Sequence, residues 1–464
     1  METVTGKNFE DIEILNLPYE ISPFGVFKKV CHSFKNAYLL ESMEGPEKLA
    51  EYSFIGFKPV SMIRSKNTTV TVLETSTGEE NVFENSDPLQ VLRGLLNKYK
   101  TKYREHRLVG GAVGYVSYDA VRMWERLPNN TLDDLDFPDL EMGIYQDGIV
   151  FNHKTNEANY YYSTENRFNL VTQILEERNK KTSLTCSDPQ VNISKETFEK
   201  AVLKAKKYVA AGDIFQVVPS KRFKINYQGD LTNFYERLRI INPSPYMYYL
   251  KMDERQIIGS SPEMLVRVED GIVETYPIAG TKPFTDDPLK NDRLSKELLA
   301  DPKERAEHVM LVDLARNDLG KISEYGTVEV PLFMEVHQYS HVQHIVTRVT
   351  GKLREDLDSF DALKAVFPAG TVSGAPKVRA MEIIDEIEPT RRGPYAGAVG
   401  FFSFNGNSDF AITIRTMVVN GDKAYIQVGG GIVADSVPET EWFETEHKAS
   451  ALLNAIKNEG GTPK

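Results

Sequence analysis

The sequence is poor in cysteine, in long apolar runs and in net positive charge. Its 464 residues include only two cysteines, Cys31 and Cys186, which lie far apart and outside any metal-like spacing. This argues against a disulfide framework and fits a reducing compartment. The first residues lack the apolar core of a signal peptide, and no apolar run is long enough to span a bilayer. We therefore expect a soluble protein of the cytoplasm with no membrane partner.

The formal net charge is −12. Such an excess of carboxylates argues against a nucleic-acid-binding surface. If the ligand is itself an anion, something must offset the acidic groups around it. A divalent cation is one answer.

The length allows two or three ordinary domains or one large composite domain, and a hydrophobic content of 41% supports a proper core. The polar stretch 181–193 predicts a linker between an N-terminal region, residues 1–180, and a second region, residues 194–464. Ser194 has the character of a helix cap, and residues 69–73 alternate as a strand should. Asn420-Gly421, between two alternating apolar runs, predicts a hairpin.

Residues 368–377 form the stretch around which the chain is organised. Glycine and proline mark a turn, and a long helical pattern follows. Small residues allow close backbone approach, and the first amides of a helix attract anions. Lys377 adds a positive charge beside them. On its own, the pattern is equally typical of a tight loop before a surface helix.

Two helical segments each carry a Glu-x-x-Glu pair. Glu304 and Glu307 precede an apolar run, and Glu441 and Glu444 share a helix face with Lys448. Such pairs are common on solvated helix faces. Two pairs that face each other would repel unless a cation lay between them, and Mg²⁺ prefers oxygen ligands.

Ser436 and Glu439 have the spacing of a capping box at the start of the second of these helices, with Pro438 between them. The run 409–416 is expected to be a strand, with Arg415 on the face opposite its apolar residues.

With these motifs in this order, the chain resembles the chorismate-utilising enzymes from about Leu39 to Lys448. Within them it is most similar to the anthranilate synthase component I branch. The resemblance implies an α+β fold with a two-sheet sandwich core and helices packed outside. It also implies Mg²⁺ as cofactor, with Glu307 and Glu444 as ligands, Glu304 and Glu441 close behind, and the ring carboxylate of chorismate on the metal.

The resemblance also implies a set of substrate contacts. Tyr395 and Arg415 match the residues that hold the enolpyruvyl end of chorismate, which suits a guanidinium that can grip a carboxylate with two hydrogen bonds. The implied substrate-binding residues are Gly280, Thr281, Tyr395, Arg415, Gly429, Gly430, Gly431 and Lys448.

Three residues match catalytic positions of the family. His344 would act either in losing the C2 proton and expelling pyruvate or in the departure of the C4 hydroxyl, although a buried, satisfied histidine is the commoner case. Thr371 would orient the substrate. Gln216 stands where isochorismate and salicylate synthases carry a water-activating lysine, so ammonia is the expected nucleophile. Ala279 stands where aminodeoxychorismate synthases carry a lysine that attacks the ring.

The expected reaction is therefore amination of chorismate at C2 and loss of pyruvate to give anthranilate, the first step of tryptophan biosynthesis. Neither cysteine lies in a glutaminase-like elbow, so a separate glutamine amidotransferase subunit would supply the ammonia. The family's tryptophan inhibitor site matches Leu40, Glu41, Ser42, Pro245, Tyr246 and Met247. The alternatives are an aminodeoxychorismate synthase component I and a non-catalytic, tryptophan-binding regulatory subunit.

Overall fold

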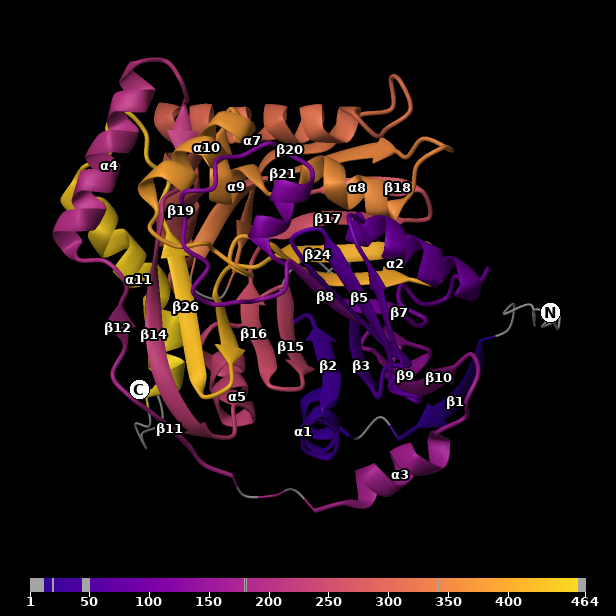
Figure 1. The fold of residues 1–464 in the computed structure, drawn as a ribbon. Helices are drawn as coiled ribbons and strands as arrows, with labels where there is room; N and C mark the ends of the chain where they lie inside the picture. The colour runs from indigo at the N-terminus through magenta and orange to yellow at the C-terminus, as the bar shows by residue number, and fades with distance from the viewer. Residues whose placement is uncertain are drawn as a thin grey trace.

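Two large antiparallel sheets lie face to face in the computed structural model of the chain, with helices on the outer faces (Figure 1). The structure describes residues 12–18, 21–43, 51–178, 180, 182–339 and 342–457. The predicted α+β sandwich with helices outside is confirmed. Within the described residues, no helix is long and apolar enough to cross a membrane.

The first sheet runs from a strand near the N-terminus to strands of the second half. Its order is β1 (Glu13–Leu17), β10 (Glu157–Tyr162), β9 (Asp147–Asn152), β3 (Tyr52–Phe57), β2 (Asn36–Glu41), β15 (Tyr246–Met252), β16 (Arg255–Ser261), β25 (Thr416–Asn420), β26 (Lys423–Gly429), β14 (Ser220–Gly229) and β11 (Leu184–Cys186), with β12 (Gln190–Val191) also paired to β14.

The second sheet also combines strands from the first and second halves of the chain. Its order is β19 (Ile278–Pro283), β21 (Val342–Lys352), β18 (Ile272–Thr275), β17 (Met264–Glu269), β24 (Ser408–Ile412), β23 (Ala398–Ser403), β7 (Gly111–Val116), β8 (Leu140–Tyr145), β4 (Ser61–Lys66), β5 (Thr69–Glu74) and β6 (Glu80–Phe83), with β20 (Glu329–Gln338) also paired to β21. A separate two-stranded ribbon joins β13 (Gln216–Val217) to β22 (Gly374–Ala375).

The helices are α1 (Pro23–Ser33), α2 (Pro88–Leu96), α3 (Phe168–Glu176), α4 (Lys195–Ala210), α5 (Thr232–Ile241), α6 (Pro288–Ala300), α7 (Pro302–Gly320), α8 (Ser359–Val366), α9 (Gly370–Ser373), α10 (Lys377–Ile387) and α11 (Pro438–Ile456), with 3₁₀ turns at η1 (Asn97–Tyr99) and η2 (Tyr118–Met123).

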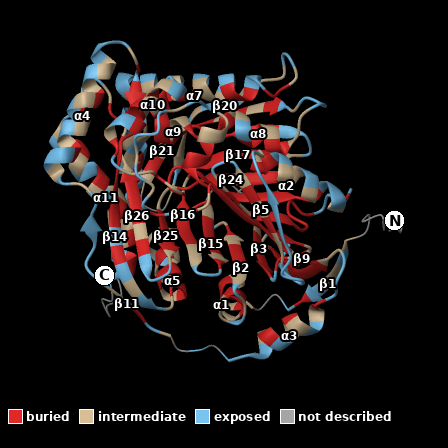
Figure 2. Ribbon diagram, viewed as in Figure 1, coloured by how far each residue is buried: buried red, intermediate tan, exposed pale blue. Residues whose placement is uncertain are grey.

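The central strands of each sheet are buried on both faces, and neighbouring residues of such a strand join cores on opposite sides. On β2, Tyr38 joins the core between the sheets, whereas Leu39 joins the core under α1 and α5. On β7, Tyr115 faces the other sheet and Val116 faces the helices. The burial map shows the resulting layers, with both sheets buried beneath partly exposed helices (Figure 2).

The boundary proposed at residues 181–193 stays a prediction. Strands from both sides of it pair within each sheet: β2 with β15 in the first, and β7 with β23 in the second. Both regions therefore contribute strands to each sheet.

Several local expectations are confirmed. Strand β5 covers the alternating residues 69–73, and Ser194 caps α4 by accepting a hydrogen bond from the amide of Thr197. Strands β25 and β26 form the predicted hairpin, with Asn420 opposite Lys423.

The capping box at α11 is a wrong prediction. The helix begins at Pro438, so the cap position falls on Val437, and Ser436 lies one residue too early. The Ser436 hydroxyl instead accepts a hydrogen bond from the amide of Val433, at 3.1 Å.

Candidate active site

His344 lies on β21 with its ring held in one orientation. Its Nδ1 is 2.7 Å from the carbonyl oxygen of Gly280 and 3.1 Å from Oγ1 of Thr281. A carbonyl can only accept, so Nδ1 carries the proton and Nε2 keeps a free lone pair. Burial lowers the pKa of His344, and the positive charge of Arg415 lowers that pKa further. The imidazole is therefore a neutral base.

Arg415 lies where the chain crosses from one sheet to the other. Strand β24 ends at Ile412 and β25 begins at Thr416, so the predicted strand through Arg415 is wrong. Its φ of +52° falls in the left-handed region, which non-glycine residues adopt mostly where the surroundings enforce it.

The side chain of Arg415 is partly buried and has no carboxylate partner among the described residues. Its Nη1 donates to the carbonyl oxygen of Lys448 at 3.3 Å, and within the described part of the chain no acidic side chain pairs with it. Burial lowers the pKa of Arg415, while the nearby phenol of Tyr395 acts in the opposite direction. A partly buried cation of this kind is a place for an anionic ligand.

The glycines at 429–431 bring backbone into contact with side chains of the site. A Cβ at Gly429 would lie 2.8 Å from Oη of Tyr395, and one at Gly431 would lie 2.5 Å from Nε2 of Gln216. At Gly430 the nearest atom would be Oε2 of Glu441, at 3.2 Å. Larger residues here would push Tyr395 and Gln216 out of place, which explains the need for glycine.

The two Glu-x-x-Glu helices border the same region. On α7, Glu304 approaches Gly280, and Glu307 accepts a hydrogen bond from Nε2 of Gln216 at 2.9 Å. Burial raises the pKa of Glu304, and the neighbouring Glu307 raises it further.

On α11, burial raises the pKa of Glu441, which lies near Gly430. Glu444 is about half exposed and pairs with Nζ of Lys448 at 2.8 Å. That same Nζ donates to the carbonyl oxygen of Gly429 at 3.1 Å.

The donor chemistry of these glutamates fits a magnesium ion. Oxygen ligands suit Mg²⁺, and a cation would stabilise the ionised forms of carboxylates whose pKa burial has raised. Within the described residues, however, no three His, Cys, Asp or Glu side chains converge closely enough to hold a metal by themselves. Any Mg²⁺ here would take one or two protein ligands and complete its shell with water and substrate oxygens.

In the organising stretch, Thr371 lines a cavity together with Glu263, whereas Lys377 binds groups on α7 and α8. Nζ of Lys377 donates to Oδ2 of Asp318 on α7, at 2.6 Å, and to the carbonyl oxygen of Val366, at 2.7 Å. The expectation that Lys377 adds free positive charge beside the helix amides is therefore wrong. Its charge is neutralised by a buried carboxylate that lies 59 residues away in the sequence.

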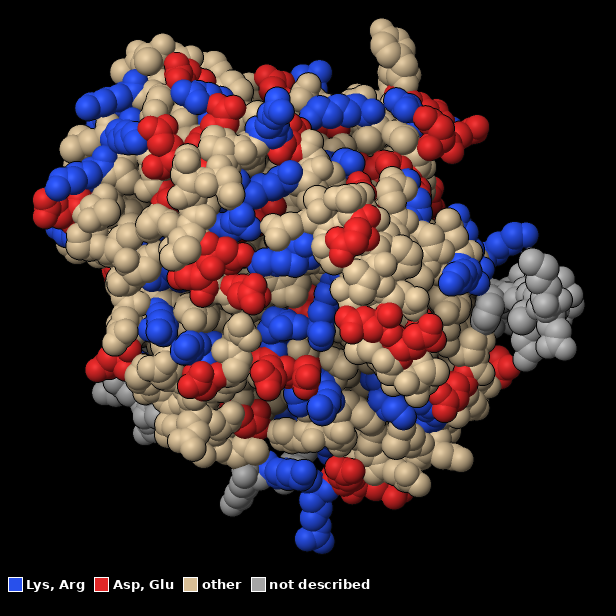
Figure 3. All heavy atoms as spheres, in the orientation of Figure 1, with Lys and Arg blue, Asp and Glu red and all other residues tan. Residues whose placement is uncertain are grey.

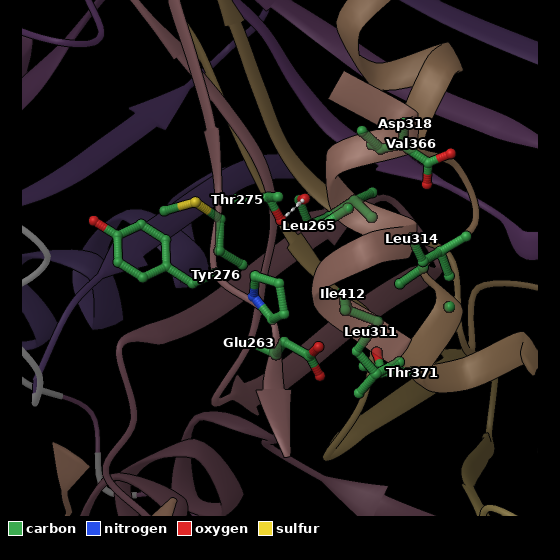
Figure 4. A pocket seen from close by; sticks show the side chains of 15 residues that line it. Glu263, Leu265, Thr275, Tyr276, Leu311, Leu314, Asp318, Val366, Thr371 and Ile412 are labelled. Atoms are coloured by element: carbon green, nitrogen blue, oxygen red, sulfur yellow. Dashed lines mark hydrogen bonds between the residues drawn. The ribbon is translucent and has the colours of Figure 1, made fainter. Parts of the chain in front are cut away.

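Glu263 is a functional candidate that sequence reasoning missed. It is buried between β16 and β17, and burial raises its pKa from 4.5 to about 8, which the neighbouring Thr371 hydroxyl offsets only in part. Glu263 and Thr371 line one end of a cavity whose other end is lined by Asp318 (Figure 4). The available signal was a single acidic residue inside the mainly apolar run 257–268, whose other polar residues are Ser260, Ser261 and Arg267.

The two halves of the predicted inhibitor site are neighbours in the first sheet. Met247 of β15 pairs with Glu41 of β2, and the amide of Met43 donates to the carbonyl oxygen of Ser244 at 3.2 Å. These bonds place residues 40–42 beside residues 245–247.

Two of these side chains already have partners. The buried Glu41 accepts hydrogen bonds from Tyr235, at 2.8 Å, and Arg239, at 2.7 Å. Tyr246 donates to Asp409 at 3.0 Å.

Charges of both signs are interspersed in small groups over the face shown in Figure 3. On this face the negative net charge is not gathered into one field, and no broad basic patch of the kind that binds nucleic acid stands out.

Comparison with known proteins gives consistent matches. Residues 35–454 match the family model described as chorismate binding enzyme. The chain is 48% identical over 438 residues to anthranilate synthase component 1 of Methanothermobacter marburgensis, covering 94% of this chain and 93% of that protein. It is 45% identical to the protein of that name from Acetivibrio thermocellus, covering 98% and 95% of the two chains. The crystal structure of anthranilate synthase component I from Streptococcus pneumoniae TIGR4 matches with a TM-score of 0.79 and 38% identity, covering 88% of this chain and 93% of that chain.

Proposed function

Since this chain belongs to the chorismate binding enzyme family and is a chorismate-utilising enzyme, we propose that it acts as anthranilate synthase component I. One observation carries the proposal: a neutral His344, whose lone pair lies on Nε2, is near a partly buried Arg415 that has no carboxylate partner among the described residues. Amination of a dianion, followed by proton loss and elimination, requires a base and a cationic group that binds the anion.

Arg415 and Tyr395 would hold the enolpyruvyl carboxylate of chorismate. The phenol of Tyr395 is buried beside Gly429, and burial raises its pKa to about 12, so it stays a hydrogen-bond donor at neutral pH. Thr281, bonded to His344, and the backbone at Gly280 and at 429–431 would bound the ring.

Glu307 and Glu444 would hold the magnesium ion, with Glu304 and Glu441 behind them. Bound there, Mg²⁺ would neutralise the ring carboxylate and stabilise negative charge that develops on it. Gln216 would keep Glu307 oriented through its hydrogen bond.

Glu263 would serve as the general acid. Its pKa of about 8 keeps it protonated at neutral pH, so it can protonate the C4 hydroxyl as that group leaves and ammonia adds at C2. Nε2 of His344 would then take the C2 proton as the bond between C3 and the ether oxygen breaks and the ring becomes aromatic. The enolpyruvate that leaves becomes pyruvate when its methylene carbon takes up a proton from water. Because Glu263 would protonate the leaving hydroxyl, removal of the C2 proton is favoured over assistance to the C4 hydroxyl as the role of His344.

Two neighbouring positions favour ammonia as nucleophile. The side-chain amide of Gln216 donates a hydrogen bond to Glu307, and an amide is too weak a base to activate water. Ala279, next to Gly280, has no amine to attack the ring and is buried. A separate glutaminase subunit would supply ammonia, and tryptophan would inhibit by binding at residues 40–42 and 245–247.

One assay tests the proposal. The purified chain is incubated with chorismate, Mg²⁺ and ammonium near pH 8, and anthranilate is followed by its blue fluorescence. Turnover that depends on both Mg²⁺ and ammonium is expected, and Arg415→Met should raise the KM for chorismate. Aminodeoxychorismate as the product would instead indicate the related synthase, and tryptophan binding without turnover would indicate a regulatory subunit.

A further inference from the structure

Arg392 is a fully buried arginine on the segment that links α10 to Tyr395. Its relative exposure is 2%, and it uses four N–H groups. Nε and Nη2 bind the two carboxylate oxygens of Glu388, at 3.0 and 2.6 Å. Nη1 donates to the carbonyl oxygen of Val372 at 2.7 Å, and Nη2 also donates to that of Val218 at 2.5 Å.

Two of these bonds reach backbone carbonyls next to residues of the proposed site, and the guanidinium also lies near a third. Val218 is two residues from Gln216, and Val372 follows Thr371 directly. The guanidinium also lies 5.6 Å from the ring centre of Tyr395. One planar cation therefore contacts the segments that carry Gln216 and Thr371, and the ring of Tyr395 itself.

Glu388 extends the same cluster to the first sheet. Its Oε1 accepts from both the amide and the hydroxyl of Ser220, each at 2.8 Å, where β14 begins. From the other side, Arg392 lies 4.7 Å from the ring centre of Tyr118, and the carboxylate of Asp119 accepts from the amide of Gly393 at 2.9 Å. The cluster thus joins the N-terminal region to the site.

We infer that Arg392 is a positioning residue, which sets the mutual placement of Gln216, Thr371 and Tyr395 through its bonds to Val218, Val372 and Glu388. The inference rests on the proposed function of this site. Only a guanidinium offers several donors in one fixed plane, so a lysine, whose ammonium is a compact point charge, cannot serve all three partners at once. Arg392 touches no reacting atom itself.

The test compares Arg392→Lys with a matched control, Arg255→Lys. Arg255 also binds both oxygens of a buried carboxylate, Glu141, at 2.7 and 2.9 Å, but it lies on β16 away from the site. Both variants should lower the urea midpoint. Only Arg392→Lys should lower kcat/KM for chorismate, by roughly 30- to 100-fold, since misplacement by about 1 Å can have an effect of that size.

A double-variant cycle separates positioning from general destabilisation. If Arg392 acts through Tyr395, then Arg392→Lys combined with Tyr395→Phe should lose about as much kcat/KM as the more damaging single variant. Losses that multiply would overturn the inference, and so would equal kinetics in Arg392→Lys and Arg255→Lys.

Hydrogen exchange gives a readout that does not need turnover. Arg392→Lys should speed amide exchange at 216–220, 370–374 and 393–397, and Arg255→Lys should not. If the wild-type chain makes no anthranilate, the proposed function fails, yet this exchange pattern still decides the role of Arg392. If Arg392→Lys does not fold, Glu388→Gln, which keeps the bonds to Val218 and Val372, should show a smaller change in the same three segments; unchanged exchange there would overturn the inference.

Discussion

Replacing Glu263 with glutamine should stabilise the protein at neutral and alkaline pH while it removes activity. Burial raises the pKa of this carboxyl from 4.5 to about 8. Between these values the unfolded chain has released the proton and the folded chain still holds it, so stability falls as pH rises. Each pKa unit corresponds to about 1.4 kcal/mol, so the full loss is about 5 kcal/mol above pH 8.

Glutamine has nearly the same shape and never ionises, so the variant should escape this loss. Urea unfolding of wild type and Glu263→Gln, measured across this pH range, should give similar free energies near pH 4.5. By pH 8 the variant should be more stable by about 5 kcal/mol. At the same time kcat should fall by roughly 10²–10⁴-fold, the usual contribution of a general acid.

A stability difference that does not change with pH would show that Glu263 is ionised in the folded protein. Near-wild-type kcat in the variant would remove its role as acid, even if the stability curve were as expected.

Three further predictions concern other parts of the site. Glu307→Gln should abolish Mg²⁺-dependent anthranilate formation and leave the circular dichroism spectrum unchanged; full turnover would remove the metal assignment. Lys377→Met should lower the free energy of unfolding by about 1–3 kcal/mol, because it removes the hydrogen bond to the buried Asp318 and leaves Lys321, at 3.0 Å, as the remaining partner of that carboxylate; the double variant with Asp318→Asn should recover part of the loss in urea titrations, and an unchanged midpoint in Lys377→Met would contradict the pairing. Ser42→Phe should relieve tryptophan inhibition without lowering the uninhibited rate, and an unchanged inhibition curve would place the inhibitor elsewhere.

The parts of the fold that local sequence determines could be predicted. The alternation at 69–73, the Ser194 cap and the Asn420-Gly421 turn each depend on neighbours within a few residues, and each is found. Spacing also indicated that each glutamate pair lies on one helix face, because residues three apart on a helix are neighbours.

The parts that depend on distant partners could not be predicted. The sequence around Lys377 gives no sign of Asp318, which lies beside it only because α10 and the end of α7 meet in the folded protein. Arg415 reads as a strand residue because no local signal marks a left-handed backbone at a non-glycine position. Glu263 has no periodic partner in the sequence, and its burial is what distinguishes it from the other acidic residues.

The charges that lack compensation distinguish the site from the rest of the interior. Elsewhere a buried guanidinium has its carboxylate: Arg267 lies 2.7 Å from Asp409, and Arg392 binds Glu388. Arg415 has only a carbonyl partner among the described residues, and burial raises the pKa of Glu263 to about 8. Leaving such groups uncompensated in a dry interior is unfavourable unless a ligand supplies the opposite charge or takes the proton. A ligand that brought a carboxylate to Arg415 and a leaving hydroxyl to Glu263 would supply a partner to each group, as the proposed reaction of chorismate requires.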